Sequence, residues 1–394
     1  MKRIITCSDG TWNKIGSDAN TNVVKMYNSI CKEGVDEKGV KVIQLKAYDE
    51  GVGTGYTLKD QLSGGLTGSG IDTNIKDMYG FIMLNYEPGD QIYLFGFSRG
   101  AYTARSIGGF IRNYGILKRE YIHLLDKAYD LYRDKNDYSS PDSDLMIAFK
   151  QAYAVEEITP IYFIGVWDTV GSLGMPLPWY HFLNAKKYKF HDVKLSAYVG
   201  HAYHALAIDE KRKLFAPTLW EKSSTVLANP DHPQKLEQRW FAGSHSDVGG
   251  GYKDSALSDL PLKWLFDKAA AAGLCFNDGV NIIPDFDKGK VVNSYTPMYW
   301  FWLPYTRKPR NKPGEEVDES VLERFKKNPT YRPRGLAMLH NTSPILKNGL
   351  FRYPGEQTSI YTFKNIIDGV PGVITFYLVV YFIFFLVYVW KFFL

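Results

Sequence analysis

The sequence predicts an α/β fold, with a mostly parallel sheet covered by helices on both faces, followed by a C-terminal transmembrane helix. Two observations lead to this expectation. Over residues 1–275, short apolar runs with β propensity alternate with longer helical patterns, as in strands joined by crossover helices. Near the C-terminus, residues 369–390 contain no charged side chain, and an apolar run of this length is typical of a membrane span.

The expected elements follow from these patterns. The expected strands are apolar along much of their length, as strands covered on both faces are: residues 3–7, 42–48, 91–96, 161–167 and 238–242. The expected helices are residues 21–31, 72–86, 100–114, 119–133 and 261–272, and residues 139–144 and 227–233 are expected to be loops. We therefore divide the chain into an α/β domain (1–275), an extension and linker that could pack on it (276–368), and a transmembrane anchor (369–394).

The extension gives weaker signals than the rest of the chain. Residues 306–313 (TRKPRNKP) are basic and contain two prolines, so we expect an exposed linker or a loop facing a membrane. Residues 314–368 have mixed polarity and poor periodicity, which leaves their role open.

The tail has the length and flanking residues of a membrane helix. At about 1.5 Å per residue, residues 369–390 would span roughly 33 Å, close to the hydrocarbon thickness of a bilayer. Trp390 would lie at the interface, and Lys391 could extend to it. Helical spacing places Tyr377, Tyr381, Phe384 and Tyr388 on one stripe through which copies could associate as a homo-oligomer. The alternative is that Tyr388 only lies at the interface and the others pack on the α/β domain.

Composition excludes several classes of function. The chain of 394 residues carries a formal net charge of +5, which suits an anionic membrane surface but is too small to indicate nucleic-acid binding. Its three cysteines (Cys7, Cys31 and Cys275) form neither a CxxC pair nor a Cys/His cluster, which indicates a reducing compartment without disulfides or zinc. The N-terminus lacks the apolar stretch of a signal peptide. We expect no metal, no cofactor, and a domain on the cytoplasmic side of the membrane.

Ser98 is the expected nucleophile. The apolar strand 91–96 runs into Gly-Phe-Ser98-Arg-Gly, and a helical pattern follows directly. A Gly-x-Ser-x-Gly pattern between a strand and a helix is typical of a sharp turn that exposes a serine hydroxyl to a base. The chain has neither a P-loop nor the glycine spacing of a dinucleotide fold, and we expect its glycine-rich segments 51–55 and 64–70 to form a loop near the site.

The expected base is His245, with His204 as the alternative. His245 follows an apolar strand and precedes the glycine-rich turn Gly249-Gly-Gly251, whereas His201 and His204 lie on a pattern that we interpret as helical. The expected acid is Asp168, which comes directly after the strand 161–167.

Other residues are expected to support this site. Asp247 is the alternative acid, although its closeness to His245 favours a role in ordering the glycine turn. The Arg99 backbone N–H is the expected oxyanion donor, with Gly10 and Thr11 as candidate second donors after the first strand. Asp9 is expected to position Arg99 or the turn, although a simple Asx turn would have the same sequence.

Several segments together resemble one known family. CSDGTWN, DEGVGTG, QIYLFGFSRGAYTARSIGGFIRNYG, FIGVWDTVGSLG, HAYHALAIDEKRKLFAPTLW and WFAGSHSDVGGGY occur in order within residues 1–275. They resemble the domain of formerly unknown function that includes the phospholipase effectors of bacterial type VI secretion. The resemblance implies an α/β-hydrolase fold and phospholipase or related esterase activity, with Ser98 in the position of the family nucleophile.

We therefore expect a membrane-anchored serine hydrolase that cleaves the carboxylic esters of membrane phospholipids. One alternative is an esterase, thioesterase or peptidase that acts on a soluble substrate with the same three residues. Another is a membrane-tethered binding module whose site is catalytically silent.

Overall fold

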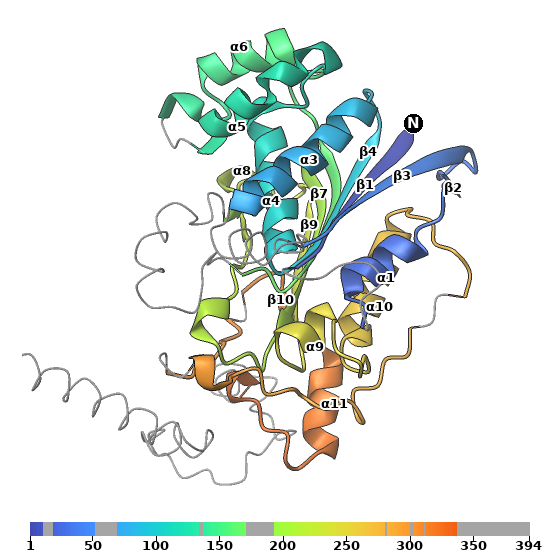
Figure 1. Ribbon diagram of the computed structural model, residues 1–394, viewed down its shortest axis with the longest axis vertical. Helices are drawn as coiled ribbons and strands as arrows, with labels where there is room; N and C mark the ends of the chain where they lie inside the picture. Colours follow the sequence, from blue (N-terminus) through green and yellow to red (C-terminus); the bar gives the residue numbers. More distant parts are fainter. Residues whose placement is uncertain are drawn as a thin grey trace, which may run out of the picture.

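A central sheet of eight strands organises the molecule (Figure 1). The computed structural model describes residues 1–10, 19–51, 69–133, 137–170, 193–279, 282–299, 303–310 and 312–336. The sheet has the order β10-β9-β7-β5-β4-β1-β3-β2, and every neighbouring pair is parallel except β2 with β3. Its strands are β1 (Lys2–Ser8), β2 (Glu33–Val35), β3 (Lys41–Asp49), β4 (Gln91–Phe97), β5 (Ile161–Trp167), β7 (Val199–Ala207), β9 (Lys235–Phe241) and β10 (Glu315–Val317). A separate parallel pair joins β6 (Lys194–Leu195) to β8 (Glu221–Lys222).

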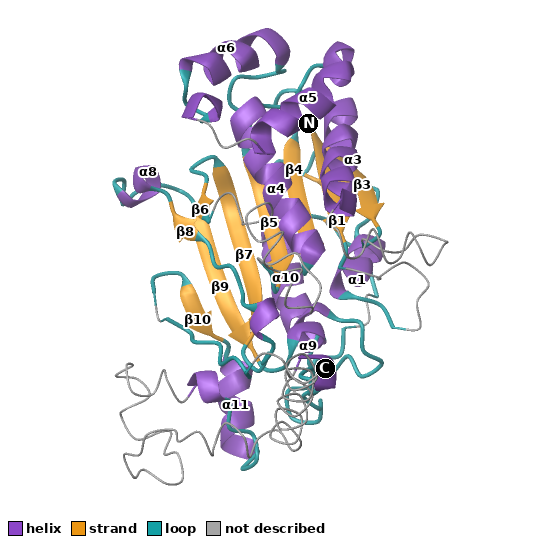
Figure 2. Ribbon diagram, turned by 60° about the vertical axis from the view of Figure 1, so that its left-hand side comes forward, coloured by secondary structure: helices purple, strands orange, loops and turns teal. Residues whose placement is uncertain are grey.

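Helices cover both faces of this sheet, as the sequence predicts (Figures 1 and 2). The α-helices are α1 (Asn22–Ser29), α3 (Ser69–Asn85), α4 (Arg99–Tyr114), α5 (Leu125–Arg133), α6 (Asp144–Tyr153), α8 (Ser224–Leu227), α9 (His245–Gly249), α10 (Asp259–Ala271) and α11 (Glu319–Lys327). The 3₁₀ turns are η1 (Arg119–Leu124), η2 (Asp137–Ser139), η3 (Lys213–Phe215) and η4 (Pro297–Tyr299). Helices α3 and α4 lie on one face, and α1 and α10 lie on the other.

Alternation along the strands explains why both faces are apolar. In β1, Ile4 packs into the cluster formed with α3 and α4, and Ile5 packs into the cluster formed with α1 and α10. In β4, Leu94 and Phe95 divide in the same way. Successive side chains of a strand point to opposite faces, so strands buried on both sides must be apolar at nearly every position.

The connections reverse direction between β1 and β4. From β1 the chain moves to β3 on one side, then returns to place β4 on the other side of β1 and continues outward through β5 to β10. Open α/β sheets bind ligands at such a switch point, beyond the carboxyl ends of the strands. Ser98 follows β4 and Asp9 follows β1, so both lie at this position.

Two secondary-structure predictions are wrong. The segment that contains His201 and His204 is strand β7, not a helix. A short apolar run buried on both faces cannot be assigned from periodicity alone, and pairing with β5 and β9 decides it. The expected helix 119–133 is divided into η1 and α5, with a kink at Tyr121.

Part of the C-terminal extension belongs to the same sheet. Strand β10 pairs with β9, and α11 packs Val321 and Phe325 against Leu206 and Trp240. Figure 2 shows β10 at one edge of the sheet with α11 beyond its end. The prediction that residues 306–313 form an exposed linker is wrong for Arg307, whose side chain is fully buried.

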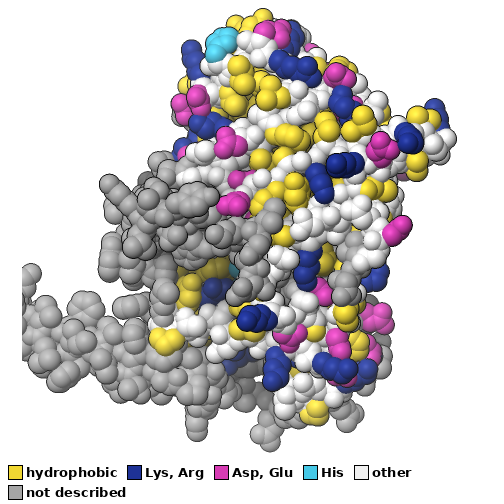
Figure 3. Space-filling view, turned by 45° about the vertical axis from the view of Figure 1, so that its right-hand side comes forward, with side chains coloured by type: hydrophobic (Ala, Val, Ile, Leu, Met, Phe, Trp, Pro, Cys, Tyr) yellow, Lys and Arg dark blue, Asp and Glu magenta, His cyan; other side chains and the backbone are white. Residues whose placement is uncertain are grey.

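The predicted transmembrane segment lies outside the described residues, together with Tyr377, Tyr381 and Tyr388. Within the described part of the chain, no helix combines the length and apolarity needed to cross a bilayer. On the face shown in Figure 3, acidic and basic side chains are interspersed. This distribution agrees with the modest net charge.

Candidate active site

Ser98 occupies a strained turn between β4 and α4. Its backbone has φ 58° and ψ −116°, a conformation that costs a non-glycine residue on the order of 1–3 kcal/mol. Among the described non-glycine residues, only Ser98 and Asp168 have positive φ. The Ser98 N–H donates to the Trp167 carbonyl at 3.0 Å, which ties the turn to the end of the neighbouring strand β5.

Both glycines of the Gly-x-Ser-x-Gly pattern are required by close backbone contacts. A Cβ at Gly96 would collide with the Gly100 carbonyl, and a Cβ at Gly100 would collide with the Ser8 carbonyl. The glycines therefore let β4, α4 and the end of β1 approach one another closely. The sequence pattern predicted this turn correctly because the constraint is local.

His245 lies within hydrogen-bonding distance of Ser98. It is the first residue of the short helix α9, and its Nε2 is 2.8 Å from Ser98 Oγ. The ring lies between two aromatic side chains, with ring centroids 4.7 Å away for Phe97 and 4.9 Å away for Phe215. Burial lowers the pKa of His245, against the opposing effect of Asp168, so the imidazole is neutral near pH 7.

Asp168 is the third side chain of the site, after Ser98 and His245, and it contacts His245. Its Oδ2 is 2.6 Å from His245 Nδ1, and its Oδ1 accepts from the Ala207 N–H at 3.0 Å. The side chain has no solvent exposure. Burial alone would raise the pKa of this carboxyl, but the Arg307 charge and the bond to His245 outweigh burial and hold the pKa well below its usual range.

Arg307 is the main residue of this site that the sequence analysis missed. Its guanidinium binds Asp168 through both nitrogens, with Nη1 at 2.5 Å from Oδ1 and Nη2 at 2.9 Å from Oδ2. Both side chains are completely buried. No local pattern marks Arg307, although a buried carboxylate such as Asp168 requires a counter-charge somewhere in the chain.

Glu210 is a second charged residue that the sequence analysis did not select. Its carboxylate accepts from the His245 backbone N–H at 3.1 Å and pairs with both Arg212 Nε and Nη2. Burial would raise the pKa of Glu210, but the bonds from Arg212 lower it to about 2. Glu210 therefore fixes the start of α9 while remaining ionised.

The structure separates His204 from Ser98 and His245. His204 is fully buried in β7, and its Nε2 accepts from the Thr169 N–H at 3.0 Å. Burial, with a smaller effect of Arg105, lowers the pKa of His204 to about 3. Its position therefore fits a structural, neutral histidine.

Asp247 orders the turn, in agreement with the interpretation favoured from the sequence. It accepts from the Ser244 N–H and hydroxyl at 2.8 and 2.9 Å, which forms a capping box at the start of α9. It also accepts from the Val292 N–H at 3.0 Å. These bonds hold the segment that carries His245 against residues of the extension.

The expected oxyanion donors lie in different backbone positions. Arg99 is the first residue of α4, and the first N–H groups of a helix have no acceptor within that helix. The Gly10 N–H donates to Asp9 Oδ1 at 2.6 Å, and its role as a second oxyanion donor stays a prediction. Asp9 also accepts from Thr21 and Tyr48, and Thr11 lies outside the described residues.

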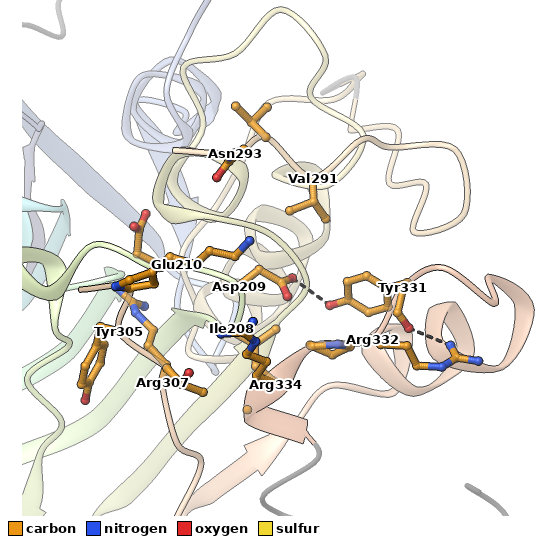
Figure 4. A pocket seen from close by; sticks show the side chains of 16 residues that line it. Ile208, Asp209, Glu210, Val291, Asn293, Tyr305, Arg307, Tyr331, Arg332 and Arg334 are labelled. Atoms are coloured by element: carbon orange, nitrogen blue, oxygen red, sulfur yellow. Dashed lines mark hydrogen bonds between the residues drawn. The ribbon is translucent and has the colours of Figure 1, made fainter. Parts of the chain in front are cut away.

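A cavity of about 220 Å³ adjoins the Arg307 side of the site (Figure 4). Its lining includes Asp209, Glu210 and Arg307 but neither Ser98 nor His245. Tyr331, from the extension, donates to Asp209 at 2.8 Å, as Figure 4 shows. Burial raises the pKa of Asp209 to about 6. The described residues contain no group of three or more His, Cys, Asp or Glu side chains arranged to hold a metal.

The arrangement supplies the parts needed for nucleophilic attack. A hydroxyl contacts a neutral imidazole, the imidazole contacts an ionised carboxylate, and a helix begins directly after the hydroxyl-bearing residue. Such a row can transfer the hydroxyl proton to the imidazole, and the helix N-terminus favours negative charge at the attacked carbonyl.

Comparison with known families identifies the chain. The profile of the family described as "T6SS, Phospholipase effector Tle1-like, catalytic domain" matches residues 2–268, which is more than half of the chain. The chain belongs to this Tle1-like family. The resemblance seen in the sequence motifs is confirmed, and the family is one of phospholipase effector catalytic domains.

Individual relatives of the Tle1-like chain are more distant. The uncharacterized protein YEL023C of Saccharomyces cerevisiae is 30% identical over 233 residues, which cover 54% of this chain and 32% of that protein. A solved structure of an uncharacterized protein from Pseudomonas aeruginosa aligns with a TM-score of 0.38 and 16% identity, over 70% of this chain and 46% of the other. The Tle1 effector bound to the VgrG spike aligns with a TM-score of 0.32 and 18% identity, over 64% and 51%. The chain therefore spans about a third to a half of the length of these relatives.

Proposed function

We propose that this Tle1-like chain is a serine hydrolase that cleaves carboxylic esters of membrane lipids, with phospholipids as the expected substrate class. One observation carries the proposal. Ser98, His245 and Asp168, which come from three distant parts of the chain, are joined by contacts of 2.8 and 2.6 Å at the carboxyl edge of the sheet. Membership in a family of phospholipase effector catalytic domains supports a lipid as substrate.

In the proposed reaction, His245 Nε2 takes the proton of Ser98 as the serine oxygen attacks the ester carbonyl. Asp168 holds the imidazole through Nδ1 and stabilises the imidazolium. The Arg99 N–H, at the start of α4, donates to the oxyanion. His245 returns the proton to the leaving alcohol, and water then attacks the acyl-enzyme with His245 again acting as base.

We further propose that residues 369–390 anchor the domain in a membrane, with the domain on the cytoplasmic side. The basis is the uncharged run of 22 residues in the sequence. An anchor would hold the site where its substrate is concentrated. Carbonate extraction of the full chain and of a chain that ends at Asp368 tests this part, and it is wrong if carbonate releases both equally.

The catalytic proposal is tested with Ser98→Ala and a fluorophosphonate probe. The wild-type chain should become labelled and should release fatty acid from phosphatidylcholine vesicles. Ser98→Ala should lose labelling and at least about 10³-fold in hydrolysis. Alanine keeps the Cβ and therefore the strained turn, so the variant should fold about as stably as the wild type.

The same experiment separates the alternatives. A soluble short-chain ester or thioester that is cleaved while vesicles are not would favour an enzyme for soluble substrates. Absence of both labelling and hydrolysis in the folded wild-type chain would favour a binding module and would contradict the proposal.

A further inference from the structure

Arg307 connects three parts of the candidate site. Besides its two bonds to Asp168, its Nη1 donates to the Ala207 carbonyl at 2.8 Å, and its Nη2 donates to the Phe215 carbonyl at 2.5 Å. Ala207 ends β7, and Phe215 packs its ring edge against His245. One buried guanidinium therefore binds the residue after β5, the last residue of β7 and the residue whose ring packs against His245.

The geometry assigns a specific orientation to the Asp168 carboxylate. Oδ1 accepts from Ala207 N and Arg307 Nη1, and Oδ2 accepts from His245 Nδ1 and Arg307 Nη2. A guanidinium is planar and matches both carboxylate oxygens at once. Rotation of the carboxylate away from His245 would break both arginine bonds inside a site without solvent exposure.

Arg307 also contributes to the charge balance around His245. Among the described residues, the charged groups that face this region are Asp168, after β5, Glu210 and Arg212, after β7, and Arg307 from the extension. Two carboxylates are thus matched by two guanidiniums. After burial, the Arg212 charge also lowers the pKa of His245. Arg307 shares Asp168 Oδ2 with His245, so its positive charge lies where it would act in the same direction.

We propose that Arg307 is a positioning residue for the reaction, holding the Asp168 carboxylate toward His245 and placing a positive charge beside this pair. This inference rests on the proposed serine-hydrolase function. Arg307 lies beyond residues 2–268, which match the family profile. In this proposal the functional unit includes residues 303–310. Of the elements that follow them, β10 pairs with β9 and α11 packs on Leu206 and Trp240.

The test compares Arg307→Met, Arg307→Lys and the control Arg324→Met in the full chain. Arg324 is a matched control because it is also buried in the extension, donates to the Phe286 carbonyl and stacks on Tyr331. For each variant, kcat and KM for a fluorogenic ester are measured from pH 5 to 9, together with the thermal unfolding midpoint and the rate of fluorophosphonate labelling.

Arg307→Met should lower kcat about 10²-fold while KM changes little, because the triad loses its alignment and not its substrate contacts. The acidic limb of its kcat/KM profile should move up by about 1 pH unit, since a positive charge near His245 is lost. Arg307→Lys keeps the charge without the planar fork, so kcat should fall while the acidic limb stays in place. Arg324→Met should lower the unfolding midpoint without moving the limb.

Three outcomes would overturn the proposal. The first is wild-type kcat and an unmoved acidic limb in Arg307→Met. If Arg307→Met does not fold, the second is wild-type kcat in folded Arg307→Lys. The third is an equal kcat loss and limb shift in Arg324→Met. A wild-type chain without Ser98-dependent hydrolysis or labelling would instead contradict the proposed function itself.

Discussion

The two ends of the central sheet handle charge and backbone strain in different ways. At the amino end, Lys2 pairs with Glu87 at 2.7 Å, and the Glu87 side chain is 64% exposed. At the carboxyl end, Asp168 and Arg307 pair with no exposure at all, and Asp168 and Ser98 are the two described non-glycine residues with positive φ. Exposed pairs contribute little to stability, whereas buried pairs and strained residues are costly. The costly features therefore gather at the edge where we place the reaction.

We expect the greatest loss of hydrolysis from a substitution at the carboxyl end of the sheet, at His245. His245→Ala should lose at least about 10³-fold in ester hydrolysis, and combination with Ser98→Ala should add little because the residues act as a unit. His204→Gln is the matched control. Its amide oxygen can replace Nε2 as acceptor for the Thr169 N–H, so hydrolysis should fall less than about tenfold.

Hydrolysis of a fluorogenic ester, with circular dichroism to verify folding, measures both variants. An inactive His204→Gln beside an active His245→Ala would show that the base has been assigned wrongly.

A second comparison contrasts two glycines of the same helix, α4. A Cβ at Gly100 would strike the Ser8 carbonyl, whereas a Cβ at Gly108 would meet Ile161 and Ile164 methyl groups at an ordinary 3.4 Å. Gly100→Ala should destabilise the fold by roughly 1–3 kcal/mol and reduce hydrolysis. Gly108→Ala should be neutral or stabilising by up to about 1 kcal/mol, because alanine is the better helix former.

Urea unfolding of the two glycine variants gives both free energies. Equal effects would show that the close approach at Gly100 is not what the turn requires.

The pH dependence of hydrolysis tests the protonation state of His245 at the carboxyl end of the sheet. His245 must be neutral to accept the Ser98 proton, and burial lowers its pKa. Activity is therefore lost as the pH falls through this lowered pKa, and the acidic limb of kcat/KM should lie below about 6.5, the value of a free histidine. A pH–rate profile measured over the stable range of the protein checks this, and a limb clearly above pH 7 would contradict it.

The smallest effect is expected at the amino end. Glu87→Gln removes one partner of Lys2 while Asp90, at 3.0 Å, remains. Hydrolysis should be unchanged, and the unfolding midpoint should stay close to that of the wild type. A large loss of activity in this variant would show that the two ends of the sheet are coupled.

The sequence by itself determined the features that depend on neighbouring residues. Apolar runs placed β1, β3, β4 and β5 to within about a residue at each end, because strands buried on both faces must be apolar. The Gly-x-Ser-x-Gly pattern located the turn at Ser98, since only glycines permit the contacts with Ser8 and Gly100. The order of motifs along the chain was enough to indicate the family.

Only the tertiary structure decided which distant groups meet. It placed His204 in a strand against the Thr169 backbone and His245 against Ser98. It also placed Arg307 against Asp168, although the two residues are 139 positions apart in the sequence and Arg307 lies in a stretch with the composition of a linker. The composition of a segment indicates its average secondary-structure propensity and solvent exposure. The partner of a buried charge depends instead on the path of the whole chain. For that reason the sequence could indicate Asp168 as the acid, and only the fold could show that Arg307 is its partner cation.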